Sequence, residues 1–221
     1  MAIADLPDRK APPARLRGPH AQRTAAMRLR LIGSAIECLH ELGYSASTTI
    51  EILKRAHVSR GALLHHFPTK VDLMLETASH IVALQTAWYD EQLAQIEDPV
   101  ERFVAITPIT WQALKRPEGM AFLEILMATR SDSDLRDRFP PVARAIEIVQ
   151  QRGMWMLAKG AGVTDRDAVR ALTDTFLATM RGLSIQLLFA ADDDTVERAM
   201  DLVVDLKRRH VGALLRAEQQ R

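Results

Sequence analysis

The sequence predicts an all-α fold, with a three-helix helix-turn-helix domain at the N-terminal end and a larger helical domain after it. Apolar residues recur at helical spacing along most of the chain, and no alternating segments flanked by hairpin turns occur. Residues that cap helices precede these apolar runs, and proline or glycine often follows them. A chain of 221 residues can form a small module and one larger domain with its own core.

The first short helix of the motif is predicted from Thr48 to about Arg55. Thr48 has the side chain of a helix N-cap, and Glu51 stands three residues later, where it can close a capping box. The apolar side chains are expected to form one buried stripe at helical spacing, made up of Ile50, Leu53 and Ala56.

The second short helix is predicted between Ser59 and Phe67. Ser59 favours the N-cap position, and Pro68 disfavours a helical residue before it. Thr69 then caps a further helix, with Asp72 at the third position. The side chains expected to point inward are Ala62, Leu63 and Phe67. Two helices joined by such a tight turn form the motif whose second helix enters a DNA major groove.

The polar side of these helices predicts binding to double-stranded DNA. Its hydroxyl groups, bases and histidines suit phosphates and base edges. Gly61 and Ala62 are small enough for the backbone to approach DNA closely, and the free N–H groups of a first helical turn favour phosphate. The candidate DNA contacts are Thr48, Thr49, Ser59, Arg60, Gly61, Ala62, His65, His66 and Lys70.

The segment from about Arg23 to Val82 resembles the DNA-binding domain of the TetR family of bacterial transcriptional regulators. The shared pattern is a long first helix ending in Gly-Tyr, a threonine pair, an alanine-to-serine turn, a recognition helix and a lysine. In this chain these elements are Gly43-Tyr44, Thr48-Thr49, residues 56–59, residues 61–67 and Lys70. The resemblance implies repression as the usual mode of control.

Two residues depart from the family pattern. His57 stands where the turn usually has glycine, so a left-handed backbone there carries some strain, although histidine tolerates that region better than β-branched residues do. Leu64 stands where the family usually has a tyrosine that contacts phosphate. One contact to the DNA backbone is therefore expected to be missing or supplied by a histidine.

The charge distribution supports the same interpretation. The chain as a whole carries a formal charge of only +1. Residues 1–70, however, hold 11 Lys and Arg against 5 Asp and Glu, whereas residues 71–221 hold 18 against 23. A basic N-terminal domain on an acidic remainder favours phosphate binding at one end. By itself such an excess is also typical of a solvated surface.

The remaining chain is predicted to be helical, giving about nine helices in total. Residues 1–19 are expected to form a disordered arm, residues 20–70 the helix-turn-helix domain, and residues 71–221 an effector-binding and dimerisation domain. After the motif, helices are expected near residues 71–94, 99–115, 120–129, 141–159, 165–190 and 192–217. A break or bend is expected at Pro108.

The last two long helices are predicted to form a homodimer. Residues 165–190 carry apolar side chains on more than one face, so this helix is buried in a core or shared with a partner. The last helix offers Val196, Met200, Val203, Val204, Val211 and Leu214. A two-fold dimer matches a palindromic operator, which a single helix-turn-helix does not. Regulators that resemble this chain dimerise through these two helices.

The middle helices are predicted to hold a small-molecule effector that is apolar or amphipathic. Tryptophan and methionine often line adaptable apolar cavities, although at helical spacing they are also typical of an ordinary core. The candidate ligand contacts are Trp111, Met127 and Trp155. Gln112, Glu124 and Arg181 are candidate polar anchors.

Other functional classes have less support in the sequence. It lacks a phosphate loop, a GxSxG elbow and an HExxH pair, so neither an enzyme nor a cofactor is predicted. Glu76 and His80 favour a solvated helical pair over a metal site. Cys38 is expected to be buried, and a single cysteine suits the cytoplasm.

No apolar run is long enough for a membrane span, and no signal peptide is predicted. Two alternatives remain open at this stage. One is a ligand-binding helical dimer without DNA binding. The other is a small-molecule enzyme on a helical scaffold.

Overall fold

The computed structural model describes residues 19–189 and 193–220, and within these ranges the chain forms nine helices and no strand. The all-α prediction is confirmed. The helices are α1 (Pro19–Ala46), α2 (Thr49–Ala56), α3 (Arg60–His66), α4 (Lys70–Leu93), α5 (Pro99–Leu114), α6 (Pro117–Ala128), α7 (Ser133–Gly160), α8 (Arg166–Gln186) and α9 (Asp193–Gln219). The expected arm, residues 1–19, lies outside the described residues except for Pro19.

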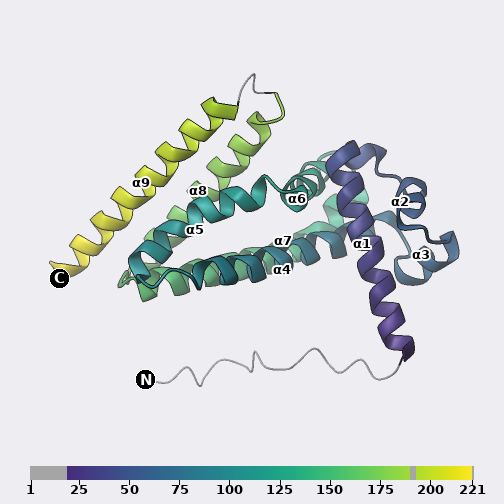
Figure 1. Cartoon of the computed structure of the whole chain (residues 1–221), viewed down its shortest axis with the longest axis horizontal. Coiled ribbons are helices and arrows are strands. Elements are labelled where there is room, and N and C mark those ends of the chain that lie inside the picture. Colours follow the sequence, from purple (N-terminus) through teal and green to yellow (C-terminus); the bar gives the residue numbers. More distant parts are fainter. Residues whose placement is uncertain (1–18, 190–192, 221) are drawn as a thin grey trace.

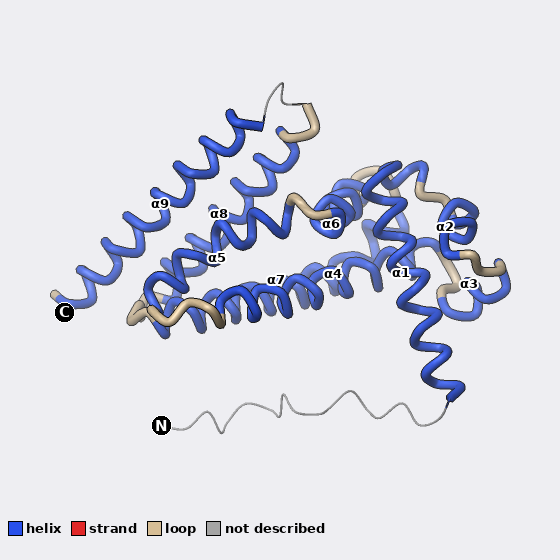
Figure 2. The backbone as a smooth tube through the Cα atoms, in the orientation of Figure 1, coloured by secondary structure: helices blue, strands red, loops and turns tan. Residues whose placement is uncertain are grey.

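Figure 1 shows the arrangement of the helices along the long axis of the molecule. The small helices α2 and α3 lie at one end, against α1. The long helices α4 and α7 run side by side away from that end, and α8 and α9 pair near the other. The loops between the described helices are short (Figure 2), so each helix is held close to its neighbours in the chain.

Helix α7 begins earlier than expected, and this is the main correction to the helix boundaries. Asp132 caps it and Ser133 begins it, so Pro140 and Pro141 lie inside the helix. Each proline removes one backbone hydrogen bond. Both prolines are exposed, as are the residues four positions earlier whose carbonyls lose their partners, and water can therefore satisfy those carbonyls. Helix α5 likewise continues through Pro108.

The helix-turn-helix has the predicted capping residues but a different buried stripe. Thr48, Ser59 and Thr69 all act as N-caps, and Thr69 forms a complete capping box with Asp72. Within α2, Ile52 is buried and Ile50 is 77% exposed. The predicted position of Ile50 in the stripe is therefore wrong, because the true core face passes through Ile52 and Ala56.

One hydrophobic cluster joins the DNA-binding end to the body of the molecule. It contains buried residues from α1 to α4 and continues into α6 and α7; examples are Leu39, Ile52, Leu63, Leu73, Ile125 and Leu135. Cys38 is buried in the same cluster, as predicted. The expected domain boundary at residues 70 and 71 lies in the first turn of α4. No break in the hydrophobic core occurs there.

The C-terminal end of α1 is held by a junction centred on Tyr44. Gly43 adopts φ 73°, a conformation that glycine enters without strain, and its backbone passes close to Glu124. The Tyr44 backbone N–H donates to Glu124 Oε2 at 2.8 Å, and the Tyr44 hydroxyl donates to Asp132 Oδ2 at 2.6 Å. Lys70 Nζ donates to the Tyr44 carbonyl at 2.7 Å. Tyr44 therefore ties α1 to α4, α6 and the start of α7.

A second link joins the start of α4 to α7. Asp72 accepts hydrogen bonds from the Thr69 backbone and hydroxyl, and it pairs with Arg138. The hydrogen bond from Arg138 is the largest cause of the lowered pKa of Asp72. The first turn of α4, directly after the helix-turn-helix, is thus fixed to the rest of the molecule by charge-assisted hydrogen bonds.

Two further clusters pack α8 and α9 against α5. Most of the apolar residues predicted for the dimer interface lie in these cores of a single chain. Val196, Met200, Val203 and Val211 are buried, and Val204 and Leu214 are partly buried. Instead, the exposed apolar side chains on α9 are Leu202 and Leu206.

Lys207 is a buried cation between α5 and α9. Its side chain is 2% exposed, and Nζ lies 4.7 Å from the centre of the Phe103 ring. Among the described residues no carboxylate lies within salt-bridge distance of it. Burial lowers the pKa of Lys207 to about 7.

Replacing Tyr44 by Phe should destabilise the protein and reduce its sensitivity to acid. The hydrogen bond from Tyr44 is the largest cause of the lowered pKa of Asp132. A lowered carboxyl pKa stabilises the fold above the unfolded value of about 3.9, and this contribution is lost as pH falls through the folded value. The variant should lose at most roughly 1.5–3 kcal/mol at neutral pH, since the carboxylate is partly solvated. Denaturant unfolding across the acidic range measures this, and identical acid profiles would contradict the prediction.

Replacing Lys207 by Met should stabilise the protein by roughly 1–3 kcal/mol near neutral pH, because an unpaired buried polar group is removed. In the native protein the lowered pKa means that the unfolded state binds more protons between about pH 7 and 10. Stability should therefore rise with pH across that window in the native chain but not in the variant. Thermal unfolding at several pH values tests this. The exposed Lys159→Met is the control, and a less stable Lys207 variant would refute the expectation.

Candidate nucleic-acid interface

The turn between α2 and α3 is built by capping and by one left-handed residue. Thr48 accepts a hydrogen bond from the Glu51 backbone N–H at 3.2 Å, and Ser59 accepts one from that of Ala62 at 3.3 Å. His57 adopts φ 52° and ψ 47°, and its N–H bonds to the end of α2. The positive φ anticipated at this position is therefore present. The turn sets the direction in which α3 leaves α2.

Helix α3 presents a solvent-facing surface at the end of the molecule. Leu63 and Phe67 are buried beneath it, whereas the residues on the opposite face are open to solvent. These exposed residues are Ser59, Arg60, Gly61, Leu64 and His65, and Thr48 at the start of α2 is exposed as well. Arg60 and His65 therefore present polar groups to solvent at this end of the molecule. Thr49, Ala62 and His66 are half-buried.

Leu64 is an addition that the candidate list lacked. Its side chain is 48% exposed although it is a large apolar residue on a short helix. In a major groove, apolar side chains contact the methyl group of thymine. The replacement of the family's tyrosine by Leu64 is the feature of the sequence that points to this position.

Lys70 and His66 are less available to phosphate than expected. The ammonium of Lys70 lies 3.9 Å from the centre of the Tyr44 ring and bonds to the Tyr44 carbonyl, and burial lowers its pKa. Burial, followed by the charges of His65 and Arg28, lowers the pKa of His66. This shift favours the neutral form of the His66 imidazole.

Arg28 holds the end of α3 in place. Its guanidinium donates to the His66 carbonyl at 3.3 Å and lies over the Phe67 ring at 4.7 Å. It also pairs with Glu76 of α4 at 3.0 Å. Glu76, which with His80 forms the helical pair weighed as a metal site, is thus engaged in an ion pair with Arg28. In the described part of the chain no group of three potential metal ligands is found.

The three candidate ligand contacts lie in different parts of the structure and do not line a common cavity. Trp111 is buried in the core with α8 and α9, and its indole N–H donates to Glu197 Oε2 at 3.1 Å. Met127 is 54% exposed at the end of α6. Trp155 lines a broad groove and lies near Arg166. A single pocket formed by all three is therefore not present, because their helices direct them to different places.

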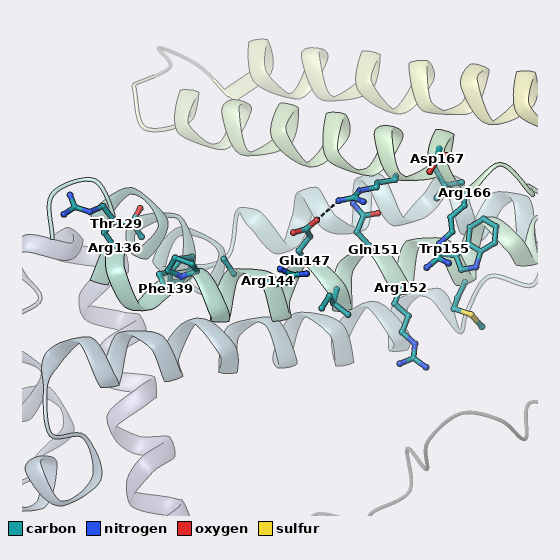
Figure 3. Close-up of a pocket in the computed structure, with 16 residues that line it drawn as sticks. Thr129, Arg136, Phe139, Arg144, Glu147, Gln151, Arg152, Trp155, Arg166 and Asp167 are labelled. Atoms are coloured by element: carbon teal, nitrogen blue, oxygen red, sulfur yellow. Dashed lines mark hydrogen bonds and ion pairs between the residues drawn. The ribbon is translucent and has the colours of Figure 1, made fainter. Parts of the chain in front are cut away.

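The groove beside Trp155 is long and open. It has a volume of about 1230 Å³ and runs along α7 and the start of α8. Figure 3 shows Arg144, Gln151 and Arg152 along α7, with Trp155 beside Arg166 at one end. Glu147 pairs with Arg170 across it at 3.1 Å. Because the groove is open to solvent, it is a feature of the surface and not an enclosed cavity.

A smaller cavity of about 280 Å³ lies between α6, α7 and α8. Apolar side chains from all three helices line it, among them Phe122 of α6, Phe139 of α7 and Leu177 of α8, together with the polar residues Glu147, Gln150 and Asp174. Arg181 also lines it. Arg181 is one of the polar anchors predicted from the sequence, and its side chain lines this cavity.

Comparison with known proteins agrees with the fold and with this surface. Residues 31–77 match the family described as bacterial regulatory proteins, tetR family. The HTH-type transcriptional regulator CymR of Pseudomonas putida is 24% identical over 192 residues, which cover 87% of this chain and 94% of the relative. The HTH-type transcriptional repressor AcnR of Corynebacterium diphtheriae is 24% identical over 185 residues, covering 82% and 91%.

The fold is also found in solved structures. A putative transcriptional regulator from Saccharomonospora viridis, crystallised in complex with choline, has a TM-score of 0.63 and 22% identity. The match covers 82% of this chain and 95% of the solved chain. Together these findings define a DNA-binding transcriptional regulator of the helix-turn-helix class. Residues 31–77, which contain the helix-turn-helix motif, match the TetR family of bacterial transcriptional regulators, and the relatives that match most of the chain are transcriptional regulators as well.

Replacing Arg60 by Ala should weaken specific DNA binding by about 1–3 kcal/mol, because a base or phosphate contact is lost from the exposed face of α3. Helicity and oligomeric state should not change, since the side chain is exposed. Fluorescence anisotropy with operator DNA measures the affinity. The matched control is Arg152→Ala, an exposed arginine on α7. Equal affinities for the Arg60 variant and the native protein would show that Arg60 does not touch DNA.

Proposed function

We propose that this protein is a repressor whose homodimer binds a palindromic operator and is released by a small-molecule effector. The observation that carries the proposal is the exposed face of α3, which stands on a buried α2–α3 core at one end of the molecule. The name of the AcnR relative as a repressor supports the direction of control. Such a protein acts on chromosomal DNA in the cytoplasm, and no catalytic role is proposed.

The proposed DNA contacts divide into three groups. Arg60 and His65 read base edges or phosphate from the exposed face of α3, and Leu64 adds an apolar contact to thymine. Thr48, Thr49 and Ser59 offer hydroxyl groups, while Gly61 and Ala62 permit close backbone approach. Lys70 and His66 contribute mainly by positioning α3 and α4, since both are partly buried.

The proposed dimer uses the outer faces of α8 and α9. Leu202 and Leu206 are 58% and 50% exposed, one helical turn apart on α9. Exposed leucines on the solvent side of a helix whose other side is buried in the core are typical of an interface between subunits. Dimerisation through this face places two copies of α3 on one operator. In this proposal residues 20–70 bind DNA, and residues 71–221 bind the effector and the second subunit.

The effector is proposed to act through α4, α6 and α7. These helices carry the groups that hold the DNA-binding end, namely Lys70, Glu124, Asp132 and the Asp72–Arg138 pair. A ligand that binds differently to two spacings of the recognition helices shifts the equilibrium between them. A coupling of about 1–3 kcal/mol changes operator occupancy by one to two orders of magnitude. The choline complex of the Saccharomonospora viridis regulator shows a small molecule bound to a protein of this fold.

Selection of DNA from a random duplex library tests the proposed function. The native protein should enrich a palindrome whose half-sites are separated by about one helical turn of DNA or a multiple of it. The double variant Leu202→Glu, Leu206→Glu should be monomeric by sedimentation and should lose most of this enrichment. Leu84→Glu, an exposed leucine on α4, is the matched control. A dimer that enriches no sequence would favour the alternative, a ligand-binding helical dimer without DNA binding.

A further inference from the structure

Arg181 on α8 is a cation without a counter-ion inside the body of the molecule. Its Nε is buried and has no hydrogen-bond partner, and no carboxylate among the described residues lies within salt-bridge distance of its guanidinium. Burial is also the cause that lowers its pKa. A buried donor without an acceptor costs free energy, and such a group calls for an explanation.

The immediate neighbours of Arg181 do not supply the missing negative charge. The Phe122 ring centre lies 5.9 Å from the guanidinium carbon. Tyr89 lies close enough to influence the charge of Arg181, but burial raises the pKa of Tyr89 to about 12. Tyr89 is therefore a neutral phenol at physiological pH. The site has a fixed positive charge with aromatic rings around it.

The two carboxylates that line the adjacent cavity already have other partners. The 280 Å³ cavity is lined by Arg181 and also by Glu147 and Asp174. Glu147 pairs with Arg170 at 3.1 Å, and Asp174 accepts a hydrogen bond from Gln151 at 2.7 Å. Asp174 also precedes Arg181 by seven residues on α8, which is about 10 Å along a helix axis. The two carboxylates therefore lie toward the other end of the cavity from Arg181.

A second unsatisfied donor is present on α4. Gln85 Nε2 is buried without a hydrogen-bond partner. Gln85 precedes Tyr89 by four residues, so both side chains are on the same face of α4. The helix that begins directly after the DNA-binding motif therefore presents an unsatisfied donor on the face that Tyr89 turns toward Arg181.

We propose that the cavity beside Arg181 binds a small organic carboxylate with an apolar body, and that the carboxylate pairs with Arg181. This inference rests on the proposed function, because it names the chemical class of the effector. Arginine binds carboxylates through two parallel hydrogen bonds, and a carboxylate oxygen can also accept from the hydroxyl of Tyr89 beside Arg181. One unpaired cation matches one negative charge, whereas a phosphate would leave charge uncompensated.

The walls of the cavity set the remaining chemistry of this ligand. Apart from Glu147, Gln150, Asp174 and Arg181 the cavity is lined by apolar side chains, and these side chains would pack against an apolar ligand body away from the carboxylate. The volume of about 280 Å³ is at the lower end of ligand pockets, which favours a single ring or a short chain. Contact with α6, α7 and α8 brings such a ligand against two of the helices that hold the DNA-binding end, since Glu124 of α6 and Arg138 of α7 bond to Tyr44 and Asp72.

Thermal unfolding of the purified full-length protein tests the proposal without DNA. Benzoate and octanoate are the anionic probes, and benzyl alcohol and octan-1-ol are the neutral analogues of similar size. At least one carboxylate should raise the melting temperature more than its alcohol, because only the anion neutralises Arg181. Calorimetric titration of that probe should show about tenfold to a hundredfold weaker binding to Arg181→Met.

Two control variants separate loss of the site from loss of the fold. Arg130→Met removes an exposed arginine at the end of α6 and should respond to the carboxylate as the native protein does. Arg181→Lys keeps the charge and should recover part of the response. Free of ligand, Arg181→Met should be at least as stable as the native protein, since a buried unpaired cation is gone.

Three results would overturn the proposal: no stabilisation by either carboxylate, equal stabilisation by the alcohols, or an undiminished response in Arg181→Met. Failure of the proposed function gives a different pattern, in which no palindrome is enriched from the DNA library while carboxylate binding persists. The carboxylate site and the proposed function can therefore be refuted independently of each other.

Discussion

The arrangement of the whole molecule depends on how Tyr44 is held. The residue stands at the end of α1, and its backbone N–H, carbonyl and hydroxyl bond to Glu124, Lys70 and Asp132 respectively. Gly43 makes this possible, because its left-handed backbone turns the chain against Glu124 where a side chain would be crowded. The DNA-binding end is thus attached to the body by hydrogen bonds to charged groups, which are directional and strong.

Because of this attachment, the helix-turn-helix motif does not move as a separate unit on a flexible linker. The hydrophobic cluster that buries Ile52 and Leu63 continues into α6 and α7, and α4 extends from the motif into the body as one helix. A change in the position of α4, α6 or α7 is therefore transmitted to α3. A bound ligand has to favour only one of two packings of these helices to alter DNA affinity.

Local rules of protein structure are broken at few places, and these places adjoin the proposed sites. His57 occupies a left-handed conformation in the turn that orients α3. Leu64 exposes a large apolar side chain on the surface proposed to meet DNA. Arg181 and Gln85 leave buried donors without acceptors. Departures of this kind are expected at functional sites, where the missing partner belongs to another molecule.

The sequence alone determined the helical class and the caps of the helix-turn-helix, because these depend on local residue chemistry and spacing. It did not determine that α7 runs through Pro140 and Pro141, or that Ile52 and not Ile50 is buried in α2, since both depend on which face the neighbouring helices cover. The separation of Trp111, Met127 and Trp155, and the unpaired state of Arg181, were likewise decided by tertiary packing. Helical spacing shows which residues share a face, and only the packed neighbours decide what that face meets.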